Sequence, residues 1–232
     1  MRPRRKISGL ILGFCAVALL FSGTSIAKDI YLAVRQDGRG GSGSAQDPFD
    51  ASTPDKHDQL LATYSYNTVF HYAAGTYQTR GWHYRTRNTA GANCKHYGSG
   101  MERTVIRLVG TNDPTHDGAI FGSDYHATAD GFELQNLTLD CNAPGNSKFR
   151  DRIGAVSAVN VVRNNMLFSN LKVEKFGIGK RGVECFPLLS YAGAGHGGRQ
   201  HENIRLENSV FRTLSGLQYV EVTHRPIYQG RI

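Results

Sequence analysis

One carboxylate in this chain stands where a predicted strand gives way to a loop. Asp140 lies in the run Leu139-Asp140-Cys141-Asn142, just before the loop 142–152. A carboxylate at such a point can bind a cation, and it can equally cap the turn by accepting hydrogen bonds from nearby backbone amides. The sequence therefore marks Asp140 as a candidate catalytic residue and leaves the capping role open.

A glutamate and a histidine form the second candidate group. Glu184 lies in an apolar run, and His196 lies in the glycine-rich stretch 193–198. A buried carboxylate beside an imidazole can supply a general acid or base. The alternative is a surface histidine on a glycine-rich loop.

An insertion of 24 residues, 80–103, is the third candidate. It mixes aromatic rings with cations and contains a single acid, Glu102. Rings stack on sugar faces and cations pair with carboxylates, so this loop predicts binding of an acidic polysaccharide. The expected substrate-binding residues are Trp82, Tyr84, Arg85 and Arg87, with Lys95, His96 and Tyr97 in the same loop. Packing of Trp82 over one end of the fold is the alternative role.

These residues must be positioned by a repeated element. Three stretches, 132–139, 166–173 and 204–211, share the pattern apolar-x-apolar-x-Asn followed by a return to apolar residues. Their asparagines, Asn136, Asn170 and Asn208, are 34 and 38 residues apart. Long, unequal intervals are typical of stacked coils joined by loops of varying length. Asparagine tolerates a left-handed bend and can bond to a copy of itself stacked above, so a ladder is predicted. Ordinary hairpin turns in a sandwich are the alternative.

Strands predominate in the rest of the pattern. We expect strands near 29–34, 68–72 and 104–110, with coils counted from Ile106. A flexible glycine-rich loop is expected at 37–44. The single helix is predicted at 53–62, because Thr53 can cap it and Pro54 suits its first position.

The N-terminal half resembles a known superfamily. A strand at 30–34, a Gly/Ser loop, Pro48-Phe49, a short helix and the run Ala74-Gly75-Thr76-Tyr77 look like the start of right-handed parallel β-helix proteins of the pectin-lyase-like superfamily. The expected fold is all-β, a right-handed parallel β-helix of roughly four to five coils. We expect a leader over 1–27, an N-terminal strand, loop and capping helix over 28–66, and the β-helix over 67–232.

The resemblance implies a substrate class more than a reaction. Lyases of this superfamily bridge calcium to a uronate, so calcium is the cofactor it allows, with Asp140 as a ligand. In β-elimination an Arg or Lys removes the C5 proton, and the candidates are Arg163, Lys180 and Arg181. Of the polygalacturonase motifs only Gly195-His196-Gly197 is present, so hydrolysis by that route lacks its carboxylate pair.

The N-terminus is typical of a signal peptide. Arg2, Arg4, Arg5 and Lys6 precede an apolar run, and Ser25-Ile26-Ala27 ends in small residues. We expect cleavage after Ala27 and a secreted or periplasmic location, with a retained membrane anchor as the alternative. Loss of the leader lowers the formal charge from +8 to +4, which argues against a nucleic-acid partner.

Three cysteines remain beyond the leader. Cys94, Cys141 and Cys185 allow one disulfide in an oxidising compartment, with three pairings, or three buried thiols.

The sequence as a whole predicts a secreted protein that acts on or binds acidic (uronate) polysaccharide, with β-elimination as the reaction if it is an enzyme. A non-catalytic binding module or surface scaffold, or an inactive fragment of a longer β-helix protein, is the alternative. No membrane partner is expected after cleavage. Because an open coil end exposes a sheet edge, we expect either that a partner covers the last coil or that the chain is truncated at the C-terminus.

Overall fold

The computed structural model describes residues 27–81, 93–110, 118–122, 130–145, 153–159, 164–176, 188–191, 202–213 and 225–227. Within these ranges the chain is mostly strand, with one α-helix and one short 3₁₀-helix at Ala143–Gly145. The predicted all-β class is confirmed at this level. The leader lies outside the described residues.

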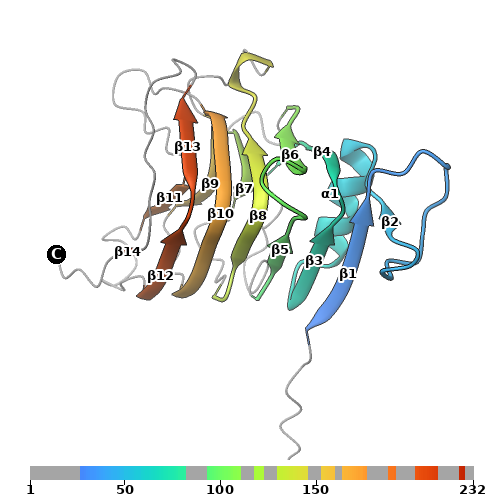
Figure 1. The fold of residues 1–232 in the computed structure, drawn as a ribbon, viewed down its shortest axis with the longest axis horizontal. Helices are drawn as coiled ribbons and strands as arrows, with labels where there is room; N and C mark the ends of the chain where they lie inside the picture. The colour runs from blue at the N-terminus through green and yellow to red at the C-terminus, as the bar shows by residue number, and fades with distance from the viewer. Residues whose placement is uncertain are drawn as a thin grey trace, which may run out of the picture.

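Most strands join one large sheet, which has two stacks of strands (Figure 1). The first stack contains β1 (Lys28–Ala33), β3 (Thr68–Tyr72), β5 (Lys95–Tyr97), the first half of β8 (Glu133–Asp140), the first half of β10 (Asn164–Phe176) and β12 (Glu202–Glu207). The second stack contains β4 (Gly75–Thr79), β6 (Thr104–Leu108), the second halves of β8 and β10, and β13 (Val210–Thr213). All of these pairs are parallel.

A separate sheet forms a third stack behind the first two (Figure 1). It consists of β7 (Gly118–Gly122), β9 (Ile153–Val159) and β11 (Leu188–Tyr191), again paired in parallel. Two short strands lie at the ends of the large sheet. β2 (Phe49–Asp50) pairs with β1, and β14 (Arg225–Ile227) pairs antiparallel with β12.

Asparagines mark the bend between the first and second stacks. Asn136 and Asn170 adopt left-handed backbone conformations with φ of 57° and 51°, and Asn208 does so between β12 and β13 with φ of 45°. The Asn170 side-chain amide donates to the Asn136 side-chain oxygen at 3.0 Å. The predicted ladder is confirmed for this pair. Because the paired strands run parallel, these asparagines do not mark hairpin turns of a sandwich.

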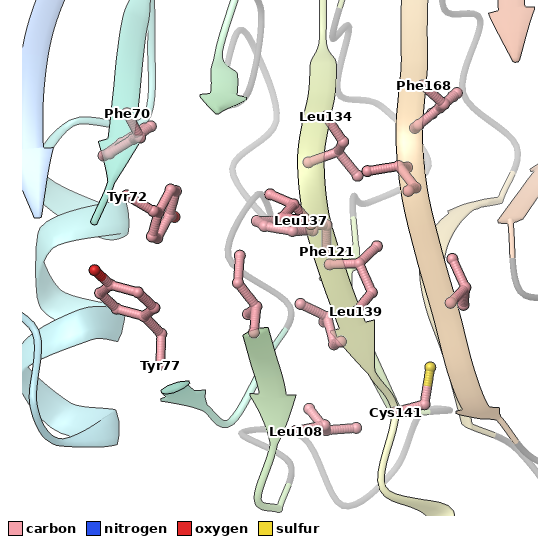
Figure 2. Close-up of a cluster of buried hydrophobic side chains, with 14 of the residues drawn as sticks. Phe70, Tyr72, Tyr77, Leu108, Phe121, Leu134, Leu137, Leu139, Cys141 and Phe168 are labelled. Atoms are coloured by element: carbon pink, nitrogen blue, oxygen red, sulfur yellow. The ribbon is translucent and has the colours of Figure 1, made fainter. Parts of the chain in front are cut away.

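The interior is built from columns of side chains in register. In the first stack Phe70, His96, Leu134, Phe168 and Leu206 are consecutive partners, and all are buried. In the second stack the corresponding partners are Tyr77, Ile106, Leu139, Val173 and Phe211. Figure 2 shows members of both columns gathered in one cluster. Continuous apolar columns explain why the apolar pattern repeats from one strand of a stack to the next.

The third stack closes this interior. The ring of Phe121 in β7 lies 4.6 Å from His96 and 5.6 Å from Phe132, measured between centroids. His96 also stacks on Phe70, with centroids 4.7 Å apart and planes 8° apart.

The sequence placed His96 in a ligand-binding loop, and this was wrong. Residues 95–97 form β5, and His96 belongs to the core.

The missed strand β5 also corrects the counting of coils. Ile106 pairs with Leu139, 33 residues later, and not with the region of Phe132. It therefore belongs to the second stack, while β5 is the strand that precedes β8 in the first stack.

Helix α1 (Pro54–Thr63) is confirmed within one residue. The Thr53 side-chain oxygen accepts a hydrogen bond from the Lys56 amide at 3.3 Å, and Pro54 stands at the first position. His57 and Leu61 form its buried side. The His57 ring contacts the Gln78 carbonyl at 3.0 Å and the Tyr72 hydroxyl at 3.3 Å, so polar as well as apolar contacts fix the helix.

The glycine-rich loop is held by specific contacts. Arg35 binds Asp37 at 2.5 Å and Asp47 at 2.6 Å, and the Gly43 amide donates to the Asp47 carbonyl. Gly43 has φ of +80°, and a Cβ there would meet the Phe49 ring at 2.2 Å. A flexible loop was expected, but the described loop is tied down by an arginine and shaped by glycine.

The described cysteines are both buried. Cys94 precedes β5, Cys141 follows β8, and no disulfide joins them. Cys185 lies outside the described residues.

Candidate functional site

The outer surface of the first stack carries a column of polar and aromatic side chains. Tyr31 in β1, His71 in β3, Tyr97 in β5 and Gln135 in β8 are consecutive register partners. Side chains alternate between the two faces of a strand, and the preceding residues Ile30, Phe70, His96 and Leu134 are buried in the core. The four register partners therefore point away from the core. We call Tyr31, His71, Tyr97 and Gln135 the outer column.

The rings of the outer column are arranged in two ways. Tyr31 and His71 stack face to face, with centroids 4.5 Å apart and planes 14° apart. Tyr97 is turned by 71° from His71, at a centroid distance of 5.9 Å. One face of the Tyr31 ring thus lies against one face of the His71 ring. The Tyr97 ring contacts His71 edge to face.

A neighbouring column of charged residues anchors these rings. The His71 Nε2 lies 2.7 Å from Asp29. Glu133 accepts hydrogen bonds from Lys95 Nζ at 2.7 Å, from the Tyr97 hydroxyl at 2.6 Å and from the Gln135 amide at 2.9 Å. The glutamate therefore sets the positions of three side chains on this face.

The same contacts set the protonation of the glutamate. Burial alone would raise the pKa of Glu133, but the hydrogen bonds from Lys95 and Tyr97 outweigh it and hold the pKa below its ordinary value. Burial and the bond to Glu133 both raise the pKa of Tyr97. At neutral pH this face therefore presents an ionised glutamate and a neutral tyrosine.

The two carboxylates of this face are farther apart than those of a glycosidase. Asp29 and Glu133 occupy the same column three strands apart, through Val69 and Lys95. At about 4.8 Å per strand they stand about 14 Å apart. Glycosidases need their two carboxyl groups within roughly 5 to 9.5 Å. This pair cannot serve as a hydrolytic acid and base.

Asp140 lies on the second stack and is completely buried. Its Oδ2 binds Arg107 Nε at 2.8 Å and Lys175 Nζ at 2.9 Å, and its Oδ1 accepts from the Asn142 amide at 3.0 Å. The bond to Asp140 raises the pKa of Lys175. Asp140 thus caps the turn and holds two cations, which is the alternative that the sequence left open. Its exposed fraction is 0%, and a catalytic role for Asp140 stays a prediction.

The remaining predicted site residues cannot be compared with the structure. They lie outside the described residues: Glu184, His196, Trp82, Tyr84, Arg85, Arg87, and the proposed bases Arg163, Lys180 and Arg181.

The described residues contain no cluster of ligands that matches the predicted calcium site. In those ranges no three His, Cys, Asp or Glu side chains gather as a metal site would require. Calcium binding stays a prediction.

Most of the outer column is not evident from the sequence. The sequence indicates Tyr97 and its neighbour Lys95 only as part of the loop 80–103, and it gives no functional signal for Tyr31, His71, Glu133 or Gln135. The available signal was alternation, since Tyr31 lies between Ile30 and Leu32 and His71 between Phe70 and Tyr72. Only the register between coils shows that these positions form one column.

Comparisons with protein-family models, with curated proteins and with solved structures found no match. Among the described residues, no helix is long and apolar enough to cross a membrane.

Proposed function

We propose that this chain is a secreted right-handed parallel β-helix protein that binds polysaccharide on the outer column. The order of the strands supports the fold. After β5 the chain visits the second stack at β6 and the third at β7, and then returns to the first stack at β8. It repeats the circuit through β9 and β10. A solenoid of parallel coils has this order.

The alignment of the outer column carries the proposal for binding. Its four side chains follow one another at the spacing of strands, about 4.8 Å, so the column extends for about 14 Å. They offer ring surfaces, hydroxyls and an amide along a line, which suits the repeated rings and hydroxyls of a glycan chain running across the strands.

Charge favours a neutral glycan on this face. Beside the outer column, Asp29, Lys95 and Glu133 together carry a formal charge of −1, and Arg205 farther along the same column is paired with Glu207, so this face has no excess of cations to attract a polyanion. The acidic substrate expected from the sequence depends on the loop 80–103, whose residues 82–92 lie outside the described ranges. It remains a prediction.

A glycan array with the full mature chain tests the proposal. We expect binding to neutral polysaccharides, and Tyr97→Ala should weaken it about tenfold, which corresponds to about 1.4 kcal/mol for a lost ring contact. Tyr66→Ala is the matched control, because Tyr66 is 51% exposed and lies off the column. Tyr97→Phe, which keeps the ring, should bind more tightly than Tyr97→Ala.

Three results would count against the proposal. Absence of binding to any glycan would reject it, and equal effects of the substitutions at Tyr97 and Tyr66 would move the site elsewhere. Release of unsaturated uronate from acidic glycans, followed by ultraviolet absorbance, would instead establish the lyase activity considered from the sequence.

A further inference from the structure

A pocket of about 290 Å³ opens at the N-terminal end of the fold, away from the residues of the outer column. It is lined by residues of α1, of β2 and of the glycine-rich loop, which lie together at the β1–β2 end of the sheet in Figure 1. Its volume is at the lower limit for ligand sites, so any ligand must be about the size of one ring.

One face of α1 supplies half of the lining. Lys56, Gln59, Leu60 and Thr63 have the spacing of a single helix face, opposite the buried His57 and Leu61. This face therefore presents an amide, a hydroxyl and an ammonium group around one apolar side chain.

Aromatic rings and an ion pair supply the rest. Phe49 and Tyr64 both line the pocket and stack with centroids 6.0 Å apart. Lys56 Nζ binds the buried carboxylate of Asp50 at 2.5 Å. Because this pair is internally neutral, the pocket offers no excess charge to a ligand.

The carboxylate is rigidly held. The Ser52 amide donates to Asp50 Oδ1 at 2.9 Å while Lys56 binds Oδ2. Burial raises the pKa of Asp50, but the hydrogen bonds from Lys56 and Ser52 hold it below its ordinary value. The Asp50 side chain is only 2% exposed, so it fixes the position of the Lys56 ammonium group, whose side chain is 49% exposed and can donate to ligand hydroxyls.

We propose that this pocket binds one neutral sugar ring. The apolar face of a pyranose would lie against Phe49, Tyr64 or Leu60, and its hydroxyls would bond to Lys56, Gln59 and Thr63. The neutral ion pair favours such a ligand over a uronate or a sulfated sugar. This site is separate from the outer column and does not require it.

Gly40 gives a direct test because it lines the pocket yet has room for a side chain. A Cβ added there would meet no atom within 4 Å. Gly40→Leu should therefore fill the pocket without disturbing the fold. Ala62→Leu is the matched control, since Ala62 is exposed on α1 and does not line the pocket.

Saturation-transfer NMR with methyl pyranosides, applied to the full mature chain, provides the measurement. For a ring of this size we expect dissociation constants of about 1–10 mM. Gly40→Leu and Gln59→Ala should each weaken binding at least tenfold, while Ala62→Leu and Tyr97→Ala should leave it unchanged. Circular dichroism establishes that each variant is folded.

Several outcomes would overturn the inference. It fails if no neutral pyranoside binds, if Gly40→Leu binds as well as the unaltered chain, or if methyl glucuronide binds more tightly than methyl glucoside. Failure of the proposed outer-column site would give a different result, because Tyr97→Ala should weaken polysaccharide binding on the glycan array. Gly40→Leu should weaken only the binding of a single pyranoside, measured by NMR.

Discussion

Truncation of Asp140 tests whether this residue is structural or belongs to a substrate site. Asp140→Ala removes the acceptor of the Asn142 amide and the partner of Arg107 and Lys175. Loss of the acceptor of the part-buried Asn142 amide costs about 1–3 kcal/mol. Arg107 and Lys175 are 41% and 42% exposed, so water screens them and each lost ion pair costs only about 0.5–1 kcal/mol.

The sum predicts a loss of about 2–5 kcal/mol in the free energy of unfolding. For a chain of this size that lowers the melting temperature by roughly 5–15 °C. Asp140→Asn keeps an oxygen for the Asn142 amide but replaces Oδ2, the acceptor of Arg107 and Lys175, with an NH2 group. The two screened ion pairs are lost and the bond from the Asn142 amide remains, so we expect a smaller loss of about 1–2 kcal/mol. Urea titration followed by circular dichroism measures both variants.

Glu102→Gln is the control, because Glu102 is 77% exposed and lies 3.3 Å from Lys172. Its stability should change by less than about 0.5 kcal/mol. If Asp140→Ala were as stable as this control, the structural role would be refuted. A loss of glycan binding in Asp140→Asn with unchanged stability would restore Asp140 as a site residue.

Three further perturbations follow from the same structure. Asn170→Ala should lower the free energy of unfolding by about 1–2 kcal/mol, because alanine strains the left-handed bend and the hydrogen bond to Asn136 is lost. Asn170→Gly should lower it less, because glycine adopts this bend without strain. Urea titration of both variants therefore separates the effect of backbone strain from that of the hydrogen bond. Because the pKa of Glu133 is lowered in the folded chain, its contribution to stability is complete above the ordinary pKa of glutamate, about 4.3. This contribution disappears as the pH falls through the lower pKa of the folded state. The melting temperature of Glu133→Gln should therefore fall less steeply from pH 7 to pH 3 than that of the unaltered chain. Gly43→Val should lower the melting temperature, because the new side chain meets the Phe49 ring and the φ of +80° disfavours any β-branched residue. A melting temperature equal to that of the unaltered chain would contradict the loop geometry.

The proposed binding sites differ in how far the sequence could indicate them. Tyr97 and Lys95 were recognised as residues suited to glycans, but their partner Glu133 is 36 residues from Tyr97 in the chain. The pocket joins Phe49 and Asp50 to one face of α1, and nothing in the local pattern of either segment indicates that contact. Both sites depend on packing between coils or between the helix and the loop, which local patterns do not encode.

Local patterns alone determined the bend and the helix. Asn136 and Asn170 could be identified because a left-handed residue is needed wherever the strand turns, and α1 could be identified from Thr53 and Pro54 because capping involves only neighbours. Tertiary structure alone decided that His96 stacks on Phe70 in the core and that Asp140 is buried between Arg107 and Lys175. Those partners come from different strands, and their register is set by parallel pairing between segments far apart in the chain. A local pattern predicts each strand, but the contact between strands is decided only when they pair.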